Sequence, residues 1–247
     1  MEPAFAPITL VAPAKLTVSL RVLGVRADGY HLIDAEMVSL DLADTLILRP
    51  GHGIELRFEP PAREPAVPDM FVPDGEDNLV ARALVLVGRQ AAVHLTKRIP
   101  PGAGLGGGSA DAAAILRWAG VTDPAVAVGL GADVAFCLAN GRARVTGIGE
   151  KIQPLVAQRR IYTLGLAPFG CSTAAVYQSW DRLGGPRGGN GNDLEAAALA
   201  VEPRLARCRD KLHAASGLQP RLAGSGSTWF VEGAFPGEDR IVATTSA

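Results

Sequence analysis

Apolar and polar residues alternate along the N-terminal part of the chain, and this pattern is typical of β-strands. Between residues 12 and 22 every even-numbered position is apolar, whereas Lys15 and Thr17 fall on the opposite face. Because strand side chains point alternately to two faces, the pattern predicts a strand with one buried face. Lys15 would lie either on a solvated face or beside a cleft. Further strands are expected at 38–49, 54–58, 93–95, 142–146, 161–166 and 240–244.

Helical spacing of apolar residues marks other segments. Residues 78–90 have apolar side chains three to four positions apart with Asp77 as a possible N-cap, and residues 203–215 end just before Gly217. Strands followed by helices, without strict alternation, indicate an α+β fold, in which we expect an antiparallel run of strands. Shorter helices are expected at 112–118 and 194–199, a helix or turn at 130–136, and loops at 59–76 and 183–193.

A glycine-rich stretch lies near the middle of the chain, where residues 100–111 read Pro-Pro-Gly-Ala-Gly-Leu-Gly-Gly-Gly-Ser-Ala-Asp before an Ala-rich helical segment. Glycine lets the backbone approach a ligand closely, and a helix N-terminus directs N–H groups and positive dipole toward an anion. We therefore interpret the stretch as a phosphate-binding loop. The plainer alternative is a glycine-rich turn capped by Ser109.

The best-known phosphate loops differ from this one. Gly102, Gly104 and Gly107 match G-x-G-x-x-G, but no strand runs straight into Gly102 and no acidic residue ends a second strand about 20 residues later, as a dinucleotide fold requires. Position 108 is glycine where the P-loop has lysine, and the Asp-Phe-Gly triplet of protein kinases is absent. These motifs therefore do not account for the loop.

Composition narrows the classes of function. The chain has 247 residues, 48% hydrophobic and 20% charged, which is typical of a globular protein large enough for one domain or two lobes. A formal net charge of −1 with scattered Lys and Arg argues against a nucleic-acid partner. We expect a cytoplasmic protein without a membrane partner, because the sequence lacks a leader pattern and a long apolar run. The three cysteines, Cys137, Cys171 and Cys208, form no disulfide or zinc pattern.

Three separated segments together resemble one superfamily. The glycine loop resembles the second motif of the galactokinase, homoserine kinase, mevalonate kinase and phosphomevalonate kinase superfamily, in which this loop wraps the phosphates of ATP. Residues 13–17, Pro-Ala-Lys-Leu-Thr, resemble its first motif, and residues 223–227, Ala-Gly-Ser-Gly-Ser, its third. The third motif leads into an apolar strand and alone would read as a hairpin turn.

Finer detail favours one branch of the superfamily. Residues 12–16, 26–31, 130–134 and 192–195 resemble the 4-diphosphocytidyl-2-C-methyl-D-erythritol kinase family over nearly the whole chain. The resemblance implies ATP-dependent phosphorylation of the 2-hydroxyl of that cytidyl substrate in the non-mevalonate isoprenoid pathway, with Mg²⁺. It also implies two lobes with the site in the cleft between them. We expect an ATP-binding lobe at 1–155 and a smaller ferredoxin-like split β-α-β lobe at 156–247.

The resemblance also assigns residues. Lys15 and Asp133 would be catalytic, Lys15 stabilising charge and Asp133 accepting or orienting the hydroxyl proton. The cytidyl substrate would be held by Thr17, Tyr30, His31 and Tyr177. The ATP-binding residues would be Asn78, near the adenine, and Pro101, Gly102, Gly104, Leu105, Gly106, Gly107, Gly108 and Ser109 around the phosphates.

Several alternatives stay open at this stage. Asp133 could be a helix N-cap, Tyr177 a core residue and His31 merely exposed. A carboxylate at Asp111 would repel phosphate unless it turned away or faced Mg²⁺, and the metal ligands are not indicated. Homoserine or mevalonate kinases and a catalytically idle binding protein are competing functions, although Gly29-Tyr30-His31 and the Lys15–Asp133 pair disfavour them. The oligomeric state is not indicated.

Overall fold

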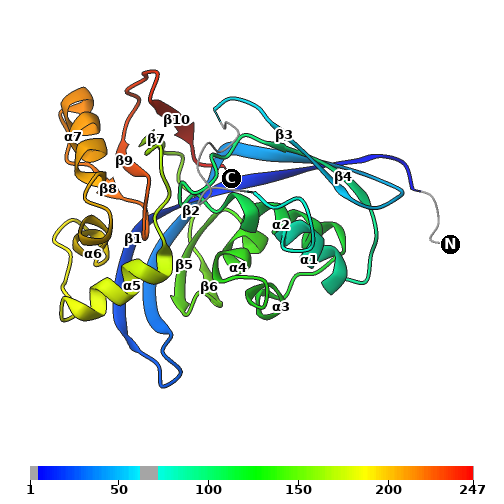
Figure 1. Ribbon diagram of the computed structural model, residues 1–247, viewed down its shortest axis with the longest axis horizontal. Helices are drawn as coiled ribbons and strands as arrows, with labels where there is room; N and C mark the ends of the chain where they lie inside the picture. The colour runs from blue at the N-terminus through cyan, green and yellow to red at the C-terminus, as the bar shows by residue number, and fades with distance from the viewer. Residues whose placement is uncertain (1–4, 62–71, 247) are drawn as a thin grey trace.

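A long antiparallel hairpin runs through the molecule and carries residues of both lobes. The computed structural model describes residues 5–61 and 72–246, so residues 62–71 of the loop expected at 59–76 lie outside the described part. Strands β1 (Ile8–Val25) and β2 (His31–Arg49) pair along their whole lengths (Figure 1). The strands expected at 12–22 and 38–49 are therefore confirmed. The first extends further at both ends, and the second extends further only at its start.

The other edge of β2 is shared by two strands. Strand β5 (Arg142–Gly147) pairs with its first half and β4 (Ala92–Lys97) with its second half, and β6 (Lys151–Pro154) pairs with β5. Strand β3 (Ile54–Phe58) runs parallel to β4, so the expected antiparallel run holds for β1 and β2 but is wrong for β3. A parallel neighbour requires a crossover, and the chain between β3 and β4 passes through helix α1 (Leu79–Leu86).

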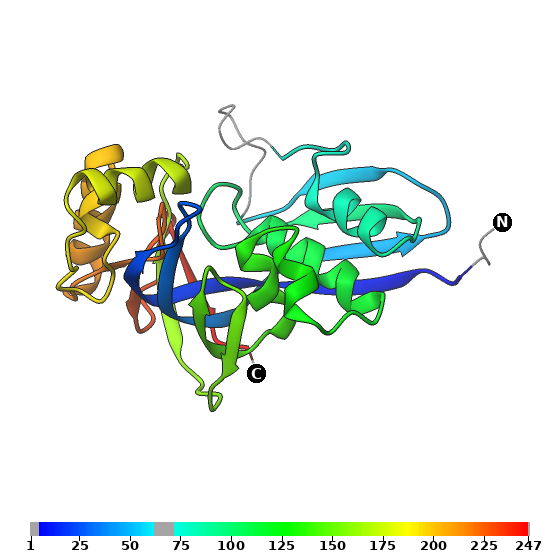
Figure 2. The ribbon, with the colours of Figure 1, turned by 90° about the horizontal axis from the view of Figure 1, so that it is seen from below.

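Four helices cover this first sheet on one side (Figures 1 and 2). Besides α1 they are α2 (Gly107–Trp118), α3 (Pro124–Val128) and α4 (Ala132–Ala139). Residues 110–116 of α2 are all buried, and the four alanines among them allow close packing against β1, α1 and α4. The helix begins at Gly107, earlier than the expected start at residue 112, which places its N-terminus inside the glycine loop.

A second, smaller sheet follows. Its strands β7 (Ile161–Gly165), β8 (Arg221–Leu222), β9 (Trp229–Glu232) and β10 (Arg240–Thr244) lie in the order β10-β7-β9-β8, with every neighbouring pair antiparallel. Helices α5 (Thr173–Arg182), α6 (Glu195–Val201) and α7 (Leu205–Ser216) lie between β7 and β8 in the chain. This order is that of a ferredoxin-like split β-α-β lobe, and the two-lobed α+β fold is confirmed.

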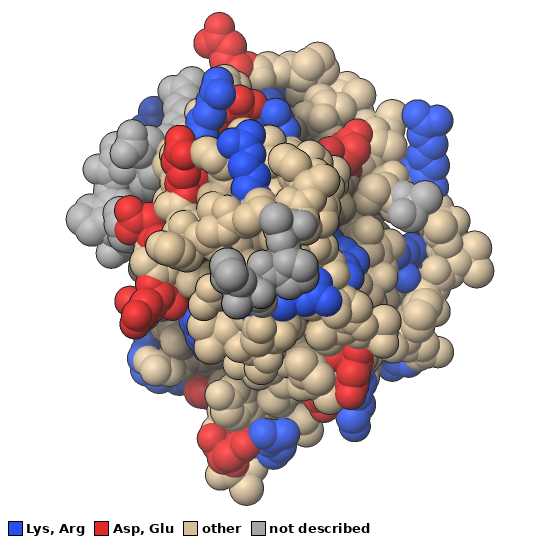
Figure 3. All heavy atoms as spheres, turned by 90° about the vertical axis from the view of Figure 1, so that its right-hand side faces the viewer, with Lys and Arg blue, Asp and Glu red and all other residues tan. Residues whose placement is uncertain are grey.

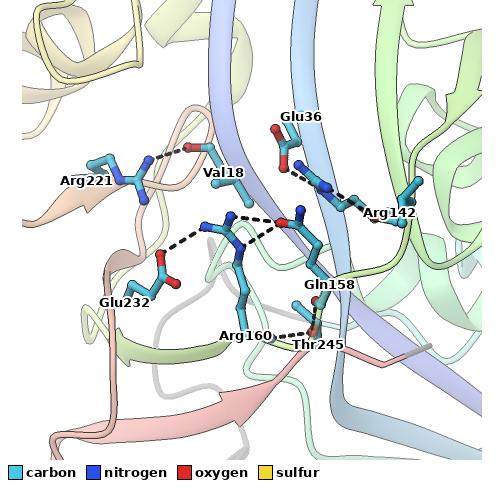
Figure 4. A network of polar contacts seen from close by, with 9 residues as sticks. Val18, Glu36, Arg142, Gln158, Arg160, Arg221, Glu232 and Thr245 are labelled. Atoms are coloured by element: carbon cyan, nitrogen blue, oxygen red, sulfur yellow. Dashed lines mark hydrogen bonds and ion pairs between the residues drawn. The ribbon is translucent and has the colours of Figure 1, made fainter.

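Polar contacts tie the second sheet to the first hairpin (Figure 4). Within the second lobe, the Arg160 guanidinium donates to Glu232 Oε2 at 3.1 Å. Beyond the end of β10, the backbone N–H of Ser246 donates to the carbonyl oxygen of Ser39 in β2 at 2.9 Å. Arg221 reaches from β8 to the carbonyl oxygen of Val18 in β1, at 3.5 Å. The lobes are therefore joined by hydrogen bonds as well as by the chain itself.

Charges on the surface are mixed. On the face drawn in Figure 3, acidic and basic side chains alternate over the described residues without forming one broad basic area. Within the described ranges, no helix combines the length and the apolar character that a bilayer crossing requires.

Candidate active site

Two hollows meet at the glycine loop. The smaller, about 240 Å³, is lined by residues 99–108 together with Asn78, Lys97 and Asp111, and we call it the nucleotide cavity. The larger, about 1040 Å³, is lined by Lys15, Asp133 and residues of both lobes, and we call it the acceptor cleft. Ser109, in the first turn of α2, lines the cleft while Gly108 beside it lines the cavity. A phosphoryl group at this helix end would face both hollows.

The conformation of the glycine loop requires glycine at two positions. Gly104 has a φ of +75°, and a Cβ there would collide with the carbonyl oxygen of Gly226. Gly106 has a φ of +69°, and a Cβ there would lie 2.7 Å from Cγ of Lys15. Gly106 is also the N-cap of α2 and no side chain caps this helix, so the alternative of a cap by Ser109 is wrong. The first N–H groups of α2 have no partner within the helix and are available to an anion.

The other loop residues contribute through their backbone. Pro101 and Gly102 line the nucleotide cavity, whereas the Leu105 side chain is buried in the core. The carbonyl oxygen of Leu105 accepts a hydrogen bond from the backbone N–H of Lys15 at 3.0 Å. The glycine loop is thus fastened directly to the strand that carries the expected catalytic lysine.

Lys15 and Asp133 form an ion pair in the acceptor cleft. Lys15 Nζ lies 3.2 Å from Asp133 Oδ2 and donates to Thr17 Oγ1 at 3.3 Å. The Lys15 side chain is only 7% exposed, so the alternative of a surface lysine is wrong, while Asp133 is 36% exposed and open to a ligand. Asp133 lies in the first turn of α4, whose N-cap is Gly131, so the N-cap alternative is also wrong.

Aromatic residues of both lobes also line the acceptor cleft. The rings of His31 and Tyr177 are 4.6 Å apart, and His31 Nε2 lies 2.9 Å from Asp181 Oδ1. Tyr30 is 59% exposed and lines the same cleft, with the Arg26 guanidinium 5.6 Å from its ring. Tyr177 therefore is not only a core residue, and His31 is not merely exposed.

The environment of Tyr177 is apolar and partly acidic. Burial, and secondarily the nearby Asp133 carboxylate, raises the pKa of the Tyr177 phenol well above its ordinary value. The ring is therefore neutral at physiological pH and presents an uncharged aromatic face to the cleft.

Asn78 lines the nucleotide cavity and holds its wall together by two hydrogen bonds. Its Oδ1 accepts from the backbone N–H of Val80 at 2.8 Å and caps α1, and its Nδ2 donates to the carbonyl oxygen of Pro73 at 2.6 Å. The N-cap expected at Asp77 is therefore one residue off. A contact of Asn78 with adenine stays a prediction.

Beneath the glycine loop lies a buried charge cluster that the sequence analysis missed, formed by Asp44, Lys97 and Asp111. Lys97 Nζ donates to Asp111 Oδ2 at 2.6 Å and also to Asp44 Oδ2, and all three residues are at most 2% exposed. Burial raises the pKa of Asp111 to about 7 even though Lys97 opposes the shift. Asp111 thus directs Oδ2 toward Lys97, which offsets its repulsion of phosphate, while its Oδ1 has no hydrogen-bond partner among the described residues and the residue lines the nucleotide cavity.

A signal for this cluster existed in the sequence. Val93, Leu95 and Lys97 occupy alternate positions of β4, and all three are buried. Lys97 therefore points to the same buried face as Val93 and Leu95, and a buried lysine requires buried acidic or hydrogen-bonding partners.

The third glycine segment, residues 223–227, packs on the glycine loop. Thr228 donates to the carbonyl oxygen of Ala103 through its backbone N–H at 3.2 Å and its hydroxyl at 2.7 Å. A Cβ on Gly224 would lie 3.5 Å from Thr17 Oγ1, so this backbone passes directly beside Thr17. The three segments that carried the resemblance therefore converge on one site.

Comparison with known proteins decides the family. Residues 78–122 match the model of the GHMP kinases N terminal domain. A 4-diphosphocytidyl-2-C-methyl-D-erythritol kinase of Paracoccus denitrificans is 39% identical over 89% of this chain and 84% of its own length. The enzyme of that name from Paramagnetospirillum magneticum is 36% identical over 90% and 87%. The chain belongs to the 4-diphosphocytidyl-2-C-methyl-D-erythritol kinase family.

Solved structures agree with this membership. A crystal structure of 4-(cytidine 5'-diphospho)-2C-methyl-D-erythritol kinase has 28% identity and a TM-score of 0.72, covering 97% of this chain and 100% of that one. A homoserine kinase of Cytophaga hutchinsonii has 17% identity and a TM-score of 0.60, covering 100% and 96%, and supports the fold alone. As a member of a kinase family, the protein is a small-molecule kinase that uses ATP.

Proposed function

We propose that this kinase transfers the γ-phosphoryl group of ATP to the 2-hydroxyl of 4-diphosphocytidyl-2-C-methyl-D-erythritol, a step of the non-mevalonate route to isoprenoid precursors. The observation that carries the proposal is the Lys15–Asp133 ion pair, 3.2 Å apart, in a cleft that is also lined by Tyr30, His31 and Tyr177. The cleft thus offers both the groups for activating a hydroxyl and aromatic faces for a base.

The chemical step uses Asp133 and Lys15. The substrate hydroxyl oxygen attacks the γ-phosphorus, its proton passes to Asp133, and the bond between the γ-phosphorus and the bridging oxygen breaks to release ADP. The Lys15 ammonium keeps Asp133 ionised and neutralises charge on the transferring group. Thr17, which accepts from Lys15, keeps the ammonium directed into the cleft.

The glycine loop holds the triphosphate. Gly104, Gly106, Gly107 and Gly108 leave the backbone uncovered, and the N-terminus of α2 adds its N–H groups and dipole. Ser109 would contribute its hydroxyl at the point where the nucleotide cavity meets the acceptor cleft. These contacts orient the γ-phosphoryl group toward Asp133.

We propose Mg²⁺ as the accompanying ion. Within residues 5–61 and 72–246, no group of three or more His, Cys, Asp or Glu side chains could hold a metal. Mg²⁺ commonly takes most of its ligands from substrate phosphates and water, with one or two protein oxygens, so this composition fits. The Ser109 hydroxyl and Asp111 Oδ1, which is buried without a hydrogen-bond partner in the described part, are the protein oxygens we assign. Bound Mg²⁺ would neutralise charge on the β- and γ-phosphates.

We assign the cytidyl group to the aromatic residues that line the cleft. We infer that the cytosine stacks between Tyr30 and Tyr177 while His31 hydrogen-bonds its edge. The His31 and Tyr177 rings are 4.6 Å apart with their planes tilted by 35°, so this arrangement requires the two rings to separate or the base to lie on the other face of Tyr177. Base stacking on an aromatic side chain contributes about 1–3 kcal/mol.

We also propose the lobe boundary and the compartment. A boundary between residues 155 and 156 falls after β6 and before β7, where one sheet ends and the next begins. The three cysteines are free thiols, as in a protein of the reducing cytoplasm.

Thermal shift measurements test the proposed function. CDP at about 100 times its Kd should add roughly 2.7 kcal/mol of stability, because it binds only the folded protein. Homoserine and mevalonate should leave the melting temperature unchanged at the same concentrations. Tyr177→Ala should lower the CDP stabilisation by about 1 kcal/mol or more at the same CDP concentration and keep the shift with ATP. A shift with homoserine or mevalonate but none with CDP would contradict the proposal and favour another kinase of the superfamily.

A further inference from the structure

Asn192 and Asp193 are buried polar residues in the loop at 183–193, which the sequence presents as flexible. They are 2% and 1% exposed, and the segment Asn192-Asp193-Leu194-Glu195 carried part of the family resemblance. Burying an amide and a carboxylate is unfavourable unless each is hydrogen-bonded. Their partners therefore indicate what the loop holds in place.

Asp193 fastens the loop to β1. Its Oδ1 accepts from Arg21 Nη1 at 2.7 Å and its Oδ2 accepts from the backbone N–H of Val22 at 3.0 Å. The backbone N–H of Asp193 donates to the carbonyl oxygen of Leu20 at 2.9 Å. Residues 20–22 lie a few positions beyond Lys15 on the same strand, so the loop is fixed relative to the catalytic strand.

Asn192 reaches in the other direction, to the third glycine segment. Its Nδ2 donates to the carbonyl oxygens of Leu222, at 2.8 Å, and Gly224, at 2.7 Å. Its Oδ1 accepts from the backbone N–H of Leu194 at 2.9 Å. The Asn192 amide group therefore donates one hydrogen bond to the residue before the segment 223–227 and one to a residue within it. The side chain thereby fixes the position of the start of this segment.

The fixed segment touches the catalytic machinery. Gly224 lies against Thr17, Thr17 accepts from Lys15 Nζ, and Lys15 pairs with Asp133. Gly224 and Ser225 line the acceptor cleft beside them. A displaced Gly224 would leave Thr17 free to change rotamer, and Thr17 would no longer direct the ammonium toward Asp133.

We propose that Asn192 is a positioning residue for phosphoryl transfer: it holds Gly224 against Thr17, while Asp193 fastens the same loop to the strand of Lys15. The pair thus fixes the first and third motifs, residues 13–17 and 223–227, at one spacing across the two lobes. This inference rests on the proposed function for its kinetic readout but not for its structural readout.

Asn190 provides a matched control. It lies two residues earlier in the same loop, and its Nδ2 donates to the carbonyl oxygen of Pro220 at 2.7 Å, outside the glycine segment. Asn192→Ala should lower kcat by about 100-fold, the loss expected when catalytic groups are misplaced by about 1 Å, with KM for ATP within about 3-fold. Asn190→Ala removes the same kind of hydrogen bond and should keep kcat within about 3-fold of the wild type.

Hydrogen exchange gives a readout that needs no substrate. The backbone N–H of Gly226 donates to the carbonyl oxygen of Ala223 at 3.0 Å and closes the turn of the third glycine segment. Its exchange should become about 10-fold faster in Asn192→Ala, because the free energy of local opening no longer includes breaking the Asn192 hydrogen bonds. It should stay unchanged in Asn190→Ala. Asn192→Ser, which leaves room for a bridging water, replaces the alanine variant if the latter does not fold.

Two results would overturn the inference: wild-type kcat and Gly226 exchange in the Asn192 variant that folds, or equal losses in the Asn190 and Asn192 variants. An inactive wild-type protein with the cytidyl substrate would instead overturn the proposed function. In that case the Gly226 exchange comparison still decides whether Asn192 holds the segment.

Discussion

At the scale of single residues, Lys15 acquires its role from its surroundings. The alternation of β1 places it on the polar face, but the glycine loop and α2 cover that face, so the ammonium is buried beside Asp133. The interaction of two opposite charges strengthens when water is excluded. Sequence pattern alone could not separate a solvated lysine from a cleft lysine, because that depends on what packs over the strand.

We predict that Lys15→Ala and Asp133→Asn each lower kcat by roughly 10²–10⁴-fold, as expected for a preorganised charge and a general base. ATP affinity should change little, since neither side chain lines the nucleotide cavity. Steady-state kinetics and calorimetric ATP titrations check both statements. Lys211→Ala and Asp210→Asn, on the exposed face of α7, are controls that should retain activity. Near-normal turnover in either cleft variant would refute the role assigned to that residue.

Tyr177 separates the cytidyl assignment from other kinase functions. Tyr177→Ala should weaken binding of the cytidyl substrate by about 1–3 kcal/mol, on the scale of base stacking, and leave ATP binding nearly unchanged. Tyr177→Phe keeps the aromatic face and should bind nearly as tightly as the wild type. Calorimetric titration with CDP measures both variants. Full CDP affinity in the alanine variant would contradict the assignment of the cytosine to Tyr177.

At the scale of elements, local pattern predicts strands and well-capped helices, and misses what depends on distant partners. Strand β3 and helix α7, which ends at Gly217, were predictable from periodicity and turn residues. The parallel pairing of β3 with β4 was not, because register and direction are set by tertiary contacts. Helix α5 was not predicted. Helix α2 starts earlier than expected, because the low helix propensity of glycine argues against a helical first turn at Gly107 and Gly108.

The contact between the glycine loop and the third glycine segment can be tested with paired substitutions. Gly104 and Gly120 have similar positive φ values, +75° and +82°, but only at Gly104 would a Cβ collide with Gly226, while nothing lies within 4 Å at Gly120. Gly120→Ala should cost roughly 1–3 kcal/mol of stability, the range for backbone strain. Gly104→Ala should cost more and also weaken ATP binding. Denaturant melts and ATP titrations compare the two, and equal effects would show that the close contact is unimportant.

At the scale of the whole molecule, the site exists only when both lobes are in place. Lys15 and Asp133 come from the first lobe, and Tyr177, Gly224 and Ser225 come from the second. The motif spacing predicted these members through resemblance, whereas the partners of the buried Lys97, Asp44 and Asp111, and the bonds of Asn192 emerge only from the packed chain.

Asp193 makes the joint between the lobes sensitive to acid. Burial tends to raise the pKa of its carboxyl, but the N–H of Gly188, Arg21 and the N–H of Val22 outweigh it and lower the pKa below the ordinary 3.8. Its contribution to stability is therefore full above about pH 4 and is lost as the pH falls through the lowered value. Asp193→Asn should be less stable than the wild type at pH 6, with a difference that shrinks toward pH 3. Urea melts across this range measure it, and a difference that grows on acidification would contradict the assignment.

The most direct measurement is turnover with the defined substrate. The protein, ATP and Mg²⁺ are incubated with 4-diphosphocytidyl-2-C-methyl-D-erythritol, with homoserine or with mevalonate, and ADP release and the ³¹P spectrum of the product are followed. We predict ADP release with the cytidyl substrate alone, together with one new phosphomonoester on the 2-hydroxyl, and loss of both in Asp133→Asn. Turnover of homoserine or mevalonate, with none of the cytidyl substrate, would contradict the proposed function.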